Sequence, residues 1–304
     1  MTGEQFRAHG HAVIDWIADY WDRVGTLPVR AEVAPGEVRD SLPAHPPEHG
    51  ETYDAVLADV DRLLLPGITH WQHPAFFGYF PANASYPAIL GDLLSTGLGV
   101  QGMSWVTSPA ATELEQVVLD WLAELLDLPA AWRSHGPGGG VIQDTASTAT
   151  LTALVAALYR DSEGAASTAG VGSTATVYAS REAHSSVDKA VRVAGVGTDR
   201  LRLVDVDPTT QAMDVAALTT LVEADVAAGL QPTFVVAALG TTSTGAIDPV
   251  RPIAEVCRQH GAWLHVDAAW AGVAAVCPEH RGVNDGLELV DSYATNPHKW
   301  LLTS

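Results

Sequence analysis

Apolar runs typical of buried strands alternate with helical stretches from about residue 136 onward, and this rhythm constrains the fold more than any other feature of the sequence. The alternation predicts a largely parallel sheet covered by helices on both faces, which is an α/β fold. The strand-like runs are 174–180, 201–206, 233–239, 262–267 and 291–295, and the intervening helical stretches are 185–193, 215–228 and 249–260.

The residues before this α/β region have a different organisation, dominated by helices and turns. Amphipathic patterns predict helices over 1–25 and 51–65, with a proline-rich connector between them. Residues 110–128 predict a further helix, and the small residues at 161–173 are typical of a solvated loop. We expect two parts, an N-terminal helical segment over residues 1–85 and a large α/β domain over residues 86–304.

The charge and cysteine content argue against several classes of partner. The 304 residues include 36 acidic and 16 basic side chains, and the net charge of −20 repels nucleic acids and anionic membranes. No apolar run approaches the ~18 residues of a membrane span. The two cysteines, Cys257 and Cys277, form no disulfide framework and are expected to be buried, inert thiols. We therefore expect a cytoplasmic protein without nucleic-acid or membrane partners.

A lysine and an aspartate carry the strongest chemical signal. Lys299 lies in Asn-Pro-His-Lys-Trp (296–300), and Asp267 ends the strand-like run Trp-Leu-His-Val-Asp (263–267). A lysine that can lose its proton and a buried carboxylate are what a pyridoxal 5'-phosphate (PLP) enzyme needs. The lysine forms a Schiff base with the cofactor, and the acid keeps the pyridine nitrogen protonated. Lys299 alone would be interpreted as a surface lysine, and Asp267 reverses that interpretation.

Three further segments suit the same site. Glycines 138–140 lead into a helix whose first amides and Ser147 hydroxyl fit a phosphate, although an ordinary helix cap gives the same pattern. His184 follows a strand, where it either stacks on a cofactor ring or merely caps the next helix. Hydroxyls and glycines at 240–245 follow another strand. Their convergence on one sheet edge is hard to attribute to folding alone.

A metal site is not expected. His70 and His73 have a spacing that suits a metal ion on a helix, but Pro74 and the neighbouring aromatic rings argue against a helix there. We interpret both histidines as structural.

Together these motifs resemble the PLP-dependent group II decarboxylases, especially the aromatic-L-amino-acid decarboxylase branch. The resemblance implies an aspartate-aminotransferase-like (fold type I) large domain with a mostly parallel seven-stranded sheet. It also implies that the N-terminal helical segment takes part in dimerisation and that the small C-terminal domain of the family is absent from this sequence. The matching segments are 66–71, 76–81, 108–115, 183–186, 239–242, 265–269 and 296–300.

The resemblance also implies roles for individual residues. Lys299 resembles the Schiff-base lysine, Asp267 the partner of the pyridine nitrogen and His184 the histidine that stacks on the cofactor ring. Residues 100–103 are expected to enter the neighbouring subunit's site in an intertwined homodimer. Further cofactor contacts are implied at Ala146, Ser147, Thr242, Ala269, Asn296 and His298, and an aromatic substrate pocket at Trp71, Tyr79, Phe80 and His184.

Three positions depart from the family pattern. Asp144 stands where the family usually has a small or hydroxyl residue, and Thr148 stands where it usually has an acid. A carboxylate beside the phosphate should weaken binding unless it turns away. Ala82 replaces a threonine that approaches the substrate's ring hydroxyls in animal relatives, so a catechol or phenol preference does not follow.

The expected reaction is α-decarboxylation of an aromatic L-amino acid of the tryptophan, tyrosine, phenylalanine or DOPA type to the amine and CO₂. An alternative on the same scaffold is an aromatic aldehyde synthase, which couples decarboxylation to deamination; His184 favours the simple decarboxylase. A second alternative is a catalytically incomplete fragment that only binds PLP or a dimer partner. It follows from the apolar end of the sequence at 301–304, because natural termini are usually polar.

Overall fold

The computed structural model describes residues 1–80 and 82–304. Contacts divide the chain into two compact units, Met1–Ala84 and Ser85–Ser304. Pro81, the last residue of the 76–81 match, lies outside the described residues. Within the described residues, no helix combines the length and hydropathy needed to cross a bilayer.

The first unit is built on one long helix and several short ones. The helix α1 begins at a capping box in which Thr2 and Gln5 satisfy each other's backbone amides. Asp61 accepts hydrogen bonds from Trp16 and Arg23 of α1, at 3.0 and 2.6 Å, and so holds the later turns against it. The helical segments are α1 (Gly3–Arg23), α2 (Glu37–Asp40) and α3 (Tyr53–Asp59), with 3₁₀ turns at Val24–Thr26 and Leu65–Gly67 and a π-helical turn at Val60–Leu64.

The helix predicted over 51–65 is therefore split. It forms α3 and then widens into the π-helical turn before Pro66, whose ring prevents a regular helix from continuing. Amphipathic periodicity alone does not distinguish a regular last turn from a widened one.

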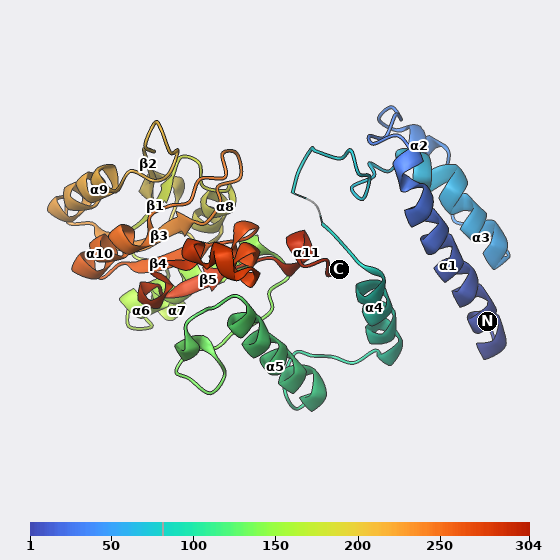
Figure 1. Cartoon of the computed structure of the whole chain (residues 1–304), viewed down its shortest axis with the longest axis horizontal. Coiled ribbons are helices and arrows are strands. Elements are labelled where there is room, and N and C mark those ends of the chain that lie inside the picture. Colours follow the sequence, from blue (N-terminus) through green and yellow to red (C-terminus); the bar gives the residue numbers. More distant parts are fainter. Residues whose placement is uncertain (81) are drawn as a thin grey trace. The chain divides into compact units, whose positions relative to one another are not determined.

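The second unit contains the predicted parallel sheet. Its five strands have the order β2-β1-β3-β4-β5, and every neighbouring pair is parallel (Figure 1). The strands are β1 (Ala175–Ser180), β2 (Leu201–Val204), β3 (Gln231–Ala238), β4 (Trp263–Asp267) and β5 (Ser292–Ala294). The helices are α4 (Tyr86–Leu98), α5 (Pro109–Leu125), α6 (Ala146–Asp161), α7 (Ala166–Ala169), α8 (Ser186–Val193), α9 (Val215–Ala227), α10 (Val250–His260) and α11 (Pro297–Trp300).

The α/β class is confirmed, but the number of strands is not seven. The described residues form five strands, and these are the five runs that periodicity predicts. The number seven came from the family resemblance. Residues 133–145, which precede α6, pair with no strand within the described part of the chain, so they add nothing to the sheet. The loop expected at 161–173 contains the short helix α7.

Alternating side chains divide the core between the two faces of the sheet. One face packs against α6 and α8, and the other packs against α9 and α10. Because successive strand residues point to opposite faces, the strands β1, β2, β3 and β4 contribute to both clusters. The α6 and α8 face includes Val177, Ala179, Phe234 and Val236, and the α9 and α10 face includes Tyr178, Val235, Ala237, Leu264 and Val266.

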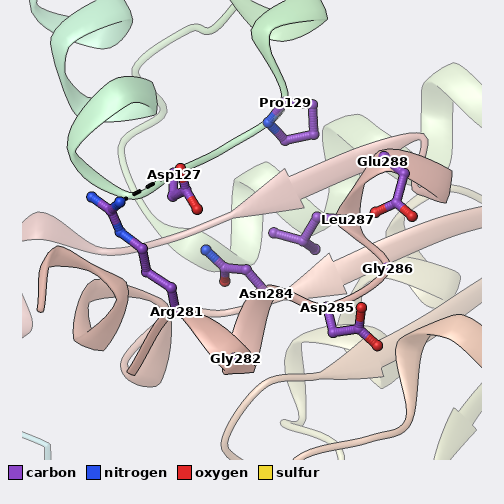
Figure 2. Close-up of a pocket in the computed structure, with 9 residues that line it drawn as sticks. All are labelled: Asp127, Pro129, Arg281, Gly282, Asn284, Asp285, Gly286, Leu287 and Glu288. Atoms are coloured by element: carbon purple, nitrogen blue, oxygen red, sulfur yellow. Dashed lines mark ion pairs between the residues drawn. The ribbon is translucent and has the colours of Figure 1, made fainter. Parts of the chain in front are cut away.

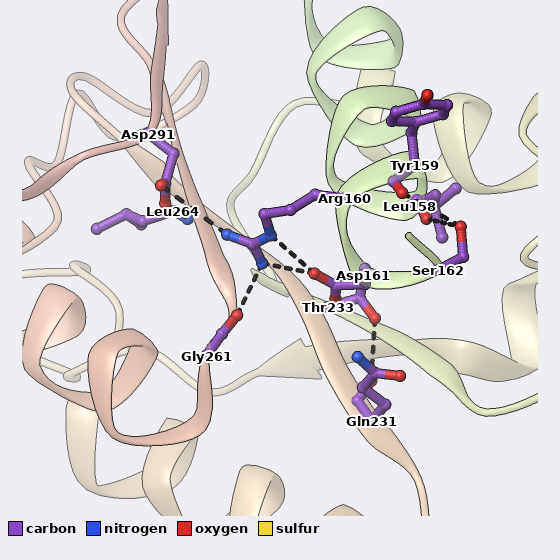
Figure 3. Close-up of polar contacts among 10 residues, drawn as sticks. All are labelled: Leu158, Tyr159, Arg160, Asp161, Ser162, Gln231, Thr233, Gly261, Leu264 and Asp291. Atoms are coloured by element: carbon purple, nitrogen blue, oxygen red, sulfur yellow. Dashed lines mark hydrogen bonds and ion pairs between the residues drawn. The ribbon is translucent and has the colours of Figure 1, made fainter. Parts of the chain in front are cut away.

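Arg160 fastens the C-terminal end of α6 to the starts of β4 and β5 (Figure 3). Its guanidinium donates to the carbonyl oxygen of Gly261 at 2.7 Å and lies 2.7 Å from the carboxylate of Asp161. It also approaches Asp291 at 4.0 Å and lies over the ring of Trp263 at 5.3 Å. These contacts fix the far end of the helix whose first turn faces the candidate site.

The two cysteines differ in exposure. Cys257 is buried in α10, as expected, and burial raises the pKa of its thiol to about 12. Cys277 is exposed, so the prediction of two buried thiols is wrong for this residue. It lies between the 3₁₀ turns Ala271–Val276 and Pro278–Asn284, where no regular element covers it.

Candidate functional site

The C-terminal edge of the sheet collects the residues that the sequence singles out. Ala238 of β3 pairs with Asp267 of β4, and Asp267 pairs with Ala294 of β5, so these three strands end at the same level. The segments that follow them therefore leave the sheet side by side, and β1 ends at the same edge beside β3. Open α/β sheets bind ligands at this edge.

Lys299 lies on the short helix α11, which follows β5. Asn296 begins this helix and donates its backbone N–H to the carbonyl oxygen of Ala269 at 3.1 Å, which ties α11 to the segment after β4. Lys299 is half-buried. Burial lowers the pKa of its ammonium group, and the negative charge of Asp267 opposes that shift. The sequence thus places an amine with a reduced proton affinity within electrostatic range of a carboxylate.

Asp267 and His184 complete this charged group. Asp267 ends β4 half-buried, and its Oδ1 accepts the backbone N–H of Ala269 at 3.1 Å. His184 follows β1, and its Nδ1 accepts the N–H of Ser186 at 3.1 Å. Desolvation lowers the pKa of His184, the positive charges of Lys299 and Lys189 act in the same direction, and Asp267 opposes them. These mutual effects place His184, Asp267 and Lys299 in one cluster.

The first turn of α6 offers amides for an anion. Thr145 caps the helix: its Oγ1 accepts the N–H of Thr148 at 3.1 Å and its carbonyl oxygen accepts the N–H of Ala149 at 3.0 Å. The N–H groups of Ala146 and Ser147 remain at the open end of the helix. A helix N-terminus of this kind binds phosphate well, since its amides and dipole both favour negative charge.

Buried hydroxyls at the same edge also suit a polar ligand. Among the described residues, the side-chain oxygens of Ser180, Ser186 and Thr295 are buried without a hydrogen-bond partner. Ser180 and Ser186 flank His184 in the chain, and Thr295 lies between β5 and α11. Buried polar atoms are rarely left unpaired, so these hydroxyls fit a site that receives a polar cofactor.

Two tryptophan rings pack beside the loop that follows β3. Trp270 donates its Nε1–H to the carbonyl oxygen of Gly240 at 2.6 Å, and its ring meets Trp300 edge to face at 5.0 Å. Gly240 has a φ of 86°, and a Cβ there would lie 2.7 Å from Trp270, so only glycine fits. Thr242, an expected cofactor contact, is exposed on this loop, whereas Thr241 is buried.

The two departures in the phosphate region contact each other. The Thr148 hydroxyl donates to Asp144 Oδ1 at 2.6 Å. This contact pairs the carboxylate at position 144, where a small or hydroxyl residue was expected, with the hydroxyl at position 148, where an acid was expected. Asp144 is exposed, so solvent screens its charge.

The expected substrate-pocket residues Trp71, Tyr79 and Phe80 lie in the first unit. The ring of Trp71 stacks with Phe76 at 5.1 Å and with Tyr79 at 5.7 Å. His70 is buried, and its Nδ1 makes a 2.9 Å hydrogen bond with the hydroxyl of Tyr20. The described residues contain no group of three or more histidine, cysteine or acidic side chains able to hold a metal ion.

A surface cleft elsewhere in the second unit has no catalytic group of this kind (Figure 2). Arg281 and Asp127 form an ion pair of 3.7 Å at its edge. Its other lining residues come mainly from 282–288, and His184, Asp267 and Lys299 are not among them. The cleft is therefore separate from the cluster at the sheet edge.

Sequence reasoning missed a buried histidine behind this cluster. His265 lies on β4 two residues before Asp267, only 1% exposed, and its ring stacks on Phe234 at 5.6 Å. Its Nδ1 lies 2.8 Å from the hydroxyl of Ser292 and its Nε2 lies 3.5 Å from that of Thr150. The available signal in the sequence was that the buried strand carries a second polar residue, His265, two positions before Asp267. In the structure His265 faces Thr150, which lies one turn into α6.

His265 is expected to make the protein sensitive to acid. Burial lowers its pKa to about 4, and the charge of Asp267 only partly opposes this. The unfolded chain binds the proton first as the pH falls. The contribution of neutral His265 to the free energy of unfolding is therefore intact above pH 6.5. It is lost as the pH falls from 6.5 to 4, and the total loss is up to about 3 kcal/mol.

Urea unfolding at pH 7 and pH 5 measures this effect. His265→Asn should reduce the loss of unfolding free energy between the two pH values by about 2 kcal/mol relative to the wild type. An equal loss in both proteins would show that His265 does not titrate in this range.

Comparison with known proteins gives consistent matches. A family model described as the pyridoxal-dependent decarboxylase conserved domain matches residues 35–304. Phenylacetaldehyde synthase from Arabidopsis thaliana is 47% identical to the chain, and aromatic-L-amino-acid decarboxylase from Mus musculus is 44% identical. Both alignments cover 100% of this chain, but only 62% and 64% of those relatives.

Solved structures agree with this result. Tryptophan decarboxylase from Catharanthus roseus in complex with L-tryptophan superposes with a TM-score of 0.94 at 43% identity. The Oryza sativa TDC structure with PLP and tryptamine gives a TM-score of 0.96 at 42% identity. The matches cover 100% of this chain and 65% and 62% of those chains, so the sequence spans less than two thirds of the relatives it matches.

Proposed function

Because the chain belongs to the pyridoxal-dependent decarboxylase family, we propose that it forms the PLP site of an enzyme that decarboxylates an aromatic L-amino acid to the amine and CO₂. The observation that carries this proposal is the cluster at the sheet edge. Half-buried Lys299 has a lowered pKa, and Asp267 and His184 lie within its electrostatic range. Perturbed titratable groups that converge in this way are typical of a catalytic centre.

Each residue of the cluster has a distinct task. When bound, PLP supplies an electron sink for the bond that breaks at the substrate's α-carbon. The lowered pKa of Lys299 increases the fraction of neutral amine, which is the form that attacks an aldehyde carbon. Asp267 would hold a proton on the pyridine nitrogen, and the first amides of α6, from Ala146 and Ser147, would hold the phosphate. His184 offers a flat ring at the edge of the site.

An aromatic substrate is supported by the relatives and by the composition of the first unit. The similar proteins are named for aromatic amino acids or their products. The stacked rings of Trp71, Phe76 and Tyr79 offer the kind of surface on which an aromatic side chain packs. With Ala82 in place of the threonine, we propose no preference for ring hydroxyls.

Product analysis tests the function. The chain is incubated with PLP and, in turn, with L-tryptophan, L-tyrosine, L-phenylalanine and L-DOPA, and CO₂, amine, aldehyde, ammonia and peroxide are measured. Equal amounts of amine and CO₂ support the proposal. Aldehyde with ammonia and peroxide supports the alternative, which the similarity to phenylacetaldehyde synthase keeps open. Cofactor binding without any product would identify the chain as a catalytically incomplete fragment.

We also propose that the protein functions as a homodimer through α4 and α5. Leu114, Val118 and Trp121 form an exposed stripe at helical spacing on α5, and α4 exposes Leu94 and Leu98. Apolar patches of this extent on a soluble protein usually mark an interface. The occupant we propose is a second copy, which would bring the exposed residues 100–103 toward its neighbour's site. The first unit, expected to join this interface, exposes apolar residues of its own on α1, Phe6 and Ile14.

Replacing Trp121, which is 66% exposed, by lysine is expected to convert the dimer to a monomer. A buried charge without a partner costs several kcal/mol in an apolar interface. Light scattering after gel filtration should give twice the 32.0 kDa chain mass for the wild type and the single mass for the variant. Val193→Lys is the control, since Val193 is a 71% exposed apolar residue on α8, outside α4 and α5. A dimeric Trp121→Lys protein would place the interface elsewhere.

The cysteines support a reducing compartment. Cys257 and Cys277 are both free, and Cys277 is exposed. An exposed free thiol suits the cytosol better than an oxidising compartment. We therefore propose a cytosolic location.

A further inference from the structure

We propose that His265 is a positioning residue that holds the strand carrying Asp267 in register with the first turn of α6, through Ser292 on one side and Thr150 on the other. This inference rests on the proposed PLP site, because it concerns how the two ends of that site are kept at a fixed separation. His265 touches neither end directly. It lies behind them, between β4, β5 and α6.

The Ser292 side of the imidazole is compatible with an Nδ1 atom that accepts. Trp263 Nε1–H can only donate, and it donates to Ser292 Oγ at 2.7 Å. This leaves the hydroxyl proton of Ser292 available to His265 Nδ1, which lies 2.8 Å away. In that arrangement the proton of a neutral imidazole is on Nε2.

The contacts on the Thr150 side select this tautomer. Thr150 Oγ1 donates to the carbonyl oxygen of Ala146 at 3.1 Å, so its lone pairs are free to accept. His265 Nε2, at 3.5 Å, then supplies the proton. The hydrogen bonds thus form one continuous series from Trp263 through Ser292, His265 and Thr150 to Ala146, in which each group donates to the next. The Nε2 contact is long, and such contacts often shorten when a ligand binds.

The position of this chain gives it a function. Asp267 is two residues beyond His265 and therefore on the same face of β4, the face that packs against α6. Ala146, which accepts the hydrogen bond of Thr150, begins the turn whose amides would hold the phosphate. Arg160 already fixes the far end of α6, so the His265 contact is the second point that fixes the helix against β4. A helix that is fixed near both ends has a defined position and a defined direction relative to the sheet.

The test separates the two sides of His265 by substitution. Asparagine places an acceptor near the Nδ1 position and keeps the bond with Ser292, whereas glutamine places a donor near Nε2 and keeps the bond with Thr150. His265→Asn and Thr150→Val both remove the link to α6, and Thr150→Ser restores its hydroxyl. The matched control is Thr219→Val, which removes the same kind of hydroxyl-to-carbonyl bond, 2.8 Å long, from α9 on the other face.

Equilibrium binding of PLP and of pyridoxal, which lacks the phosphate, is measured for each protein well below its unfolding temperature. We expect His265→Asn and Thr150→Val to weaken PLP binding about tenfold and to leave pyridoxal binding unchanged. The double variant should be no weaker than either single one, since both remove one link. His265→Gln, Thr150→Ser and Thr219→Val should keep the wild-type ratio of the two affinities.

Two results would overturn the inference: equal weakening of PLP and pyridoxal, which indicates general destabilisation, or additive effects in the double variant. Failure of the wild-type chain to bind PLP would contradict the proposed function instead. In that case, the proposed hydrogen bond between His265 and Thr150 is tested on the cofactor-free protein. ¹⁵N NMR must show the Nε2–H tautomer of His265, and urea unfolding must show non-additivity of His265→Asn with Thr150→Val; absence of either one rejects the inference.

Discussion

Lys299→Ala is expected to abolish covalent attachment of PLP and to lower turnover by at least about a thousandfold, equivalent to about 4 kcal/mol. The sequence contains only two lysines, Lys189 and Lys299, which makes this an unusually clean experiment. Lys299 is half-buried with a lowered pKa, whereas Lys189 is exposed on α8. The reduced proton affinity of Lys299 favours attack on an aldehyde carbon.

The measurement is a visible absorption spectrum with PLP before and after borohydride, followed by mass spectrometry of the reduced protein. The wild type and Lys189→Ala should both lose the band on reduction and carry one added cofactor mass on a peptide containing residue 299. Lys299→Ala should show neither change. Labelling at Lys189, or labelling that survives in Lys299→Ala, would contradict the assignment.

Asp267→Ala is expected to reduce turnover about a thousandfold while the protein still binds PLP. With PLP bound, the Asp267 carboxylate would stabilise a positive charge on the pyridine nitrogen, and this charge would supply the electron sink for the reaction. Binding depends mainly on the Lys299 bond and the phosphate amides of α6, which the substitution does not alter. The expected result is therefore a large fall in kcat with a modest rise in the PLP dissociation constant.

CO₂ release at saturating PLP measures kcat, and fluorescence titration measures cofactor affinity. Asp267→Asn is the matched variant, because it keeps the side chain's shape and the acceptor oxygen for the Ala269 N–H without the charge. It should be as slow as Asp267→Ala if charge is the cause. Turnover like that of the wild type in either variant would remove Asp267 from the mechanism.

Much of the fold followed from periodicity in the sequence. All five predicted strands exist, and the helices α8, α9 and α10 begin within one residue of the predicted stretches. The strands that the prediction made too long by two residues are β2 and β5, at the sheet edges. Leu201–Val204 stops early because Val206 pairs instead with Met213 in an antiparallel bridge, a contact formed by a turn rather than by the sheet.

The sequence also brought Lys299, Asp267 and His184 to one sheet edge, because parallel strands place their C-terminal ends together. It could not give the network of His265, Thr150 and Ser292. Those residues belong to three separate elements, and only their packing shows that a histidine inside an apolar strand has two hydroxyl partners. Pattern alone also could not show that Asp144 and Thr148 satisfy each other.

The pairing of Thr150 with His265 has a consequence for biosynthesis. The two residues are 115 positions apart in the chain. A ribosome that adds about 5 to 20 residues per second therefore makes Thr150 of α6 roughly 6 to 23 seconds before His265 of β4. During that interval the apolar face of the helix, including Leu154 and Leu158, has only part of its final cover. The turn proposed to hold the phosphate is thus synthesised early but completed late, and the proposed cofactor site is incomplete in a nascent chain until β5 and Lys299 have been made.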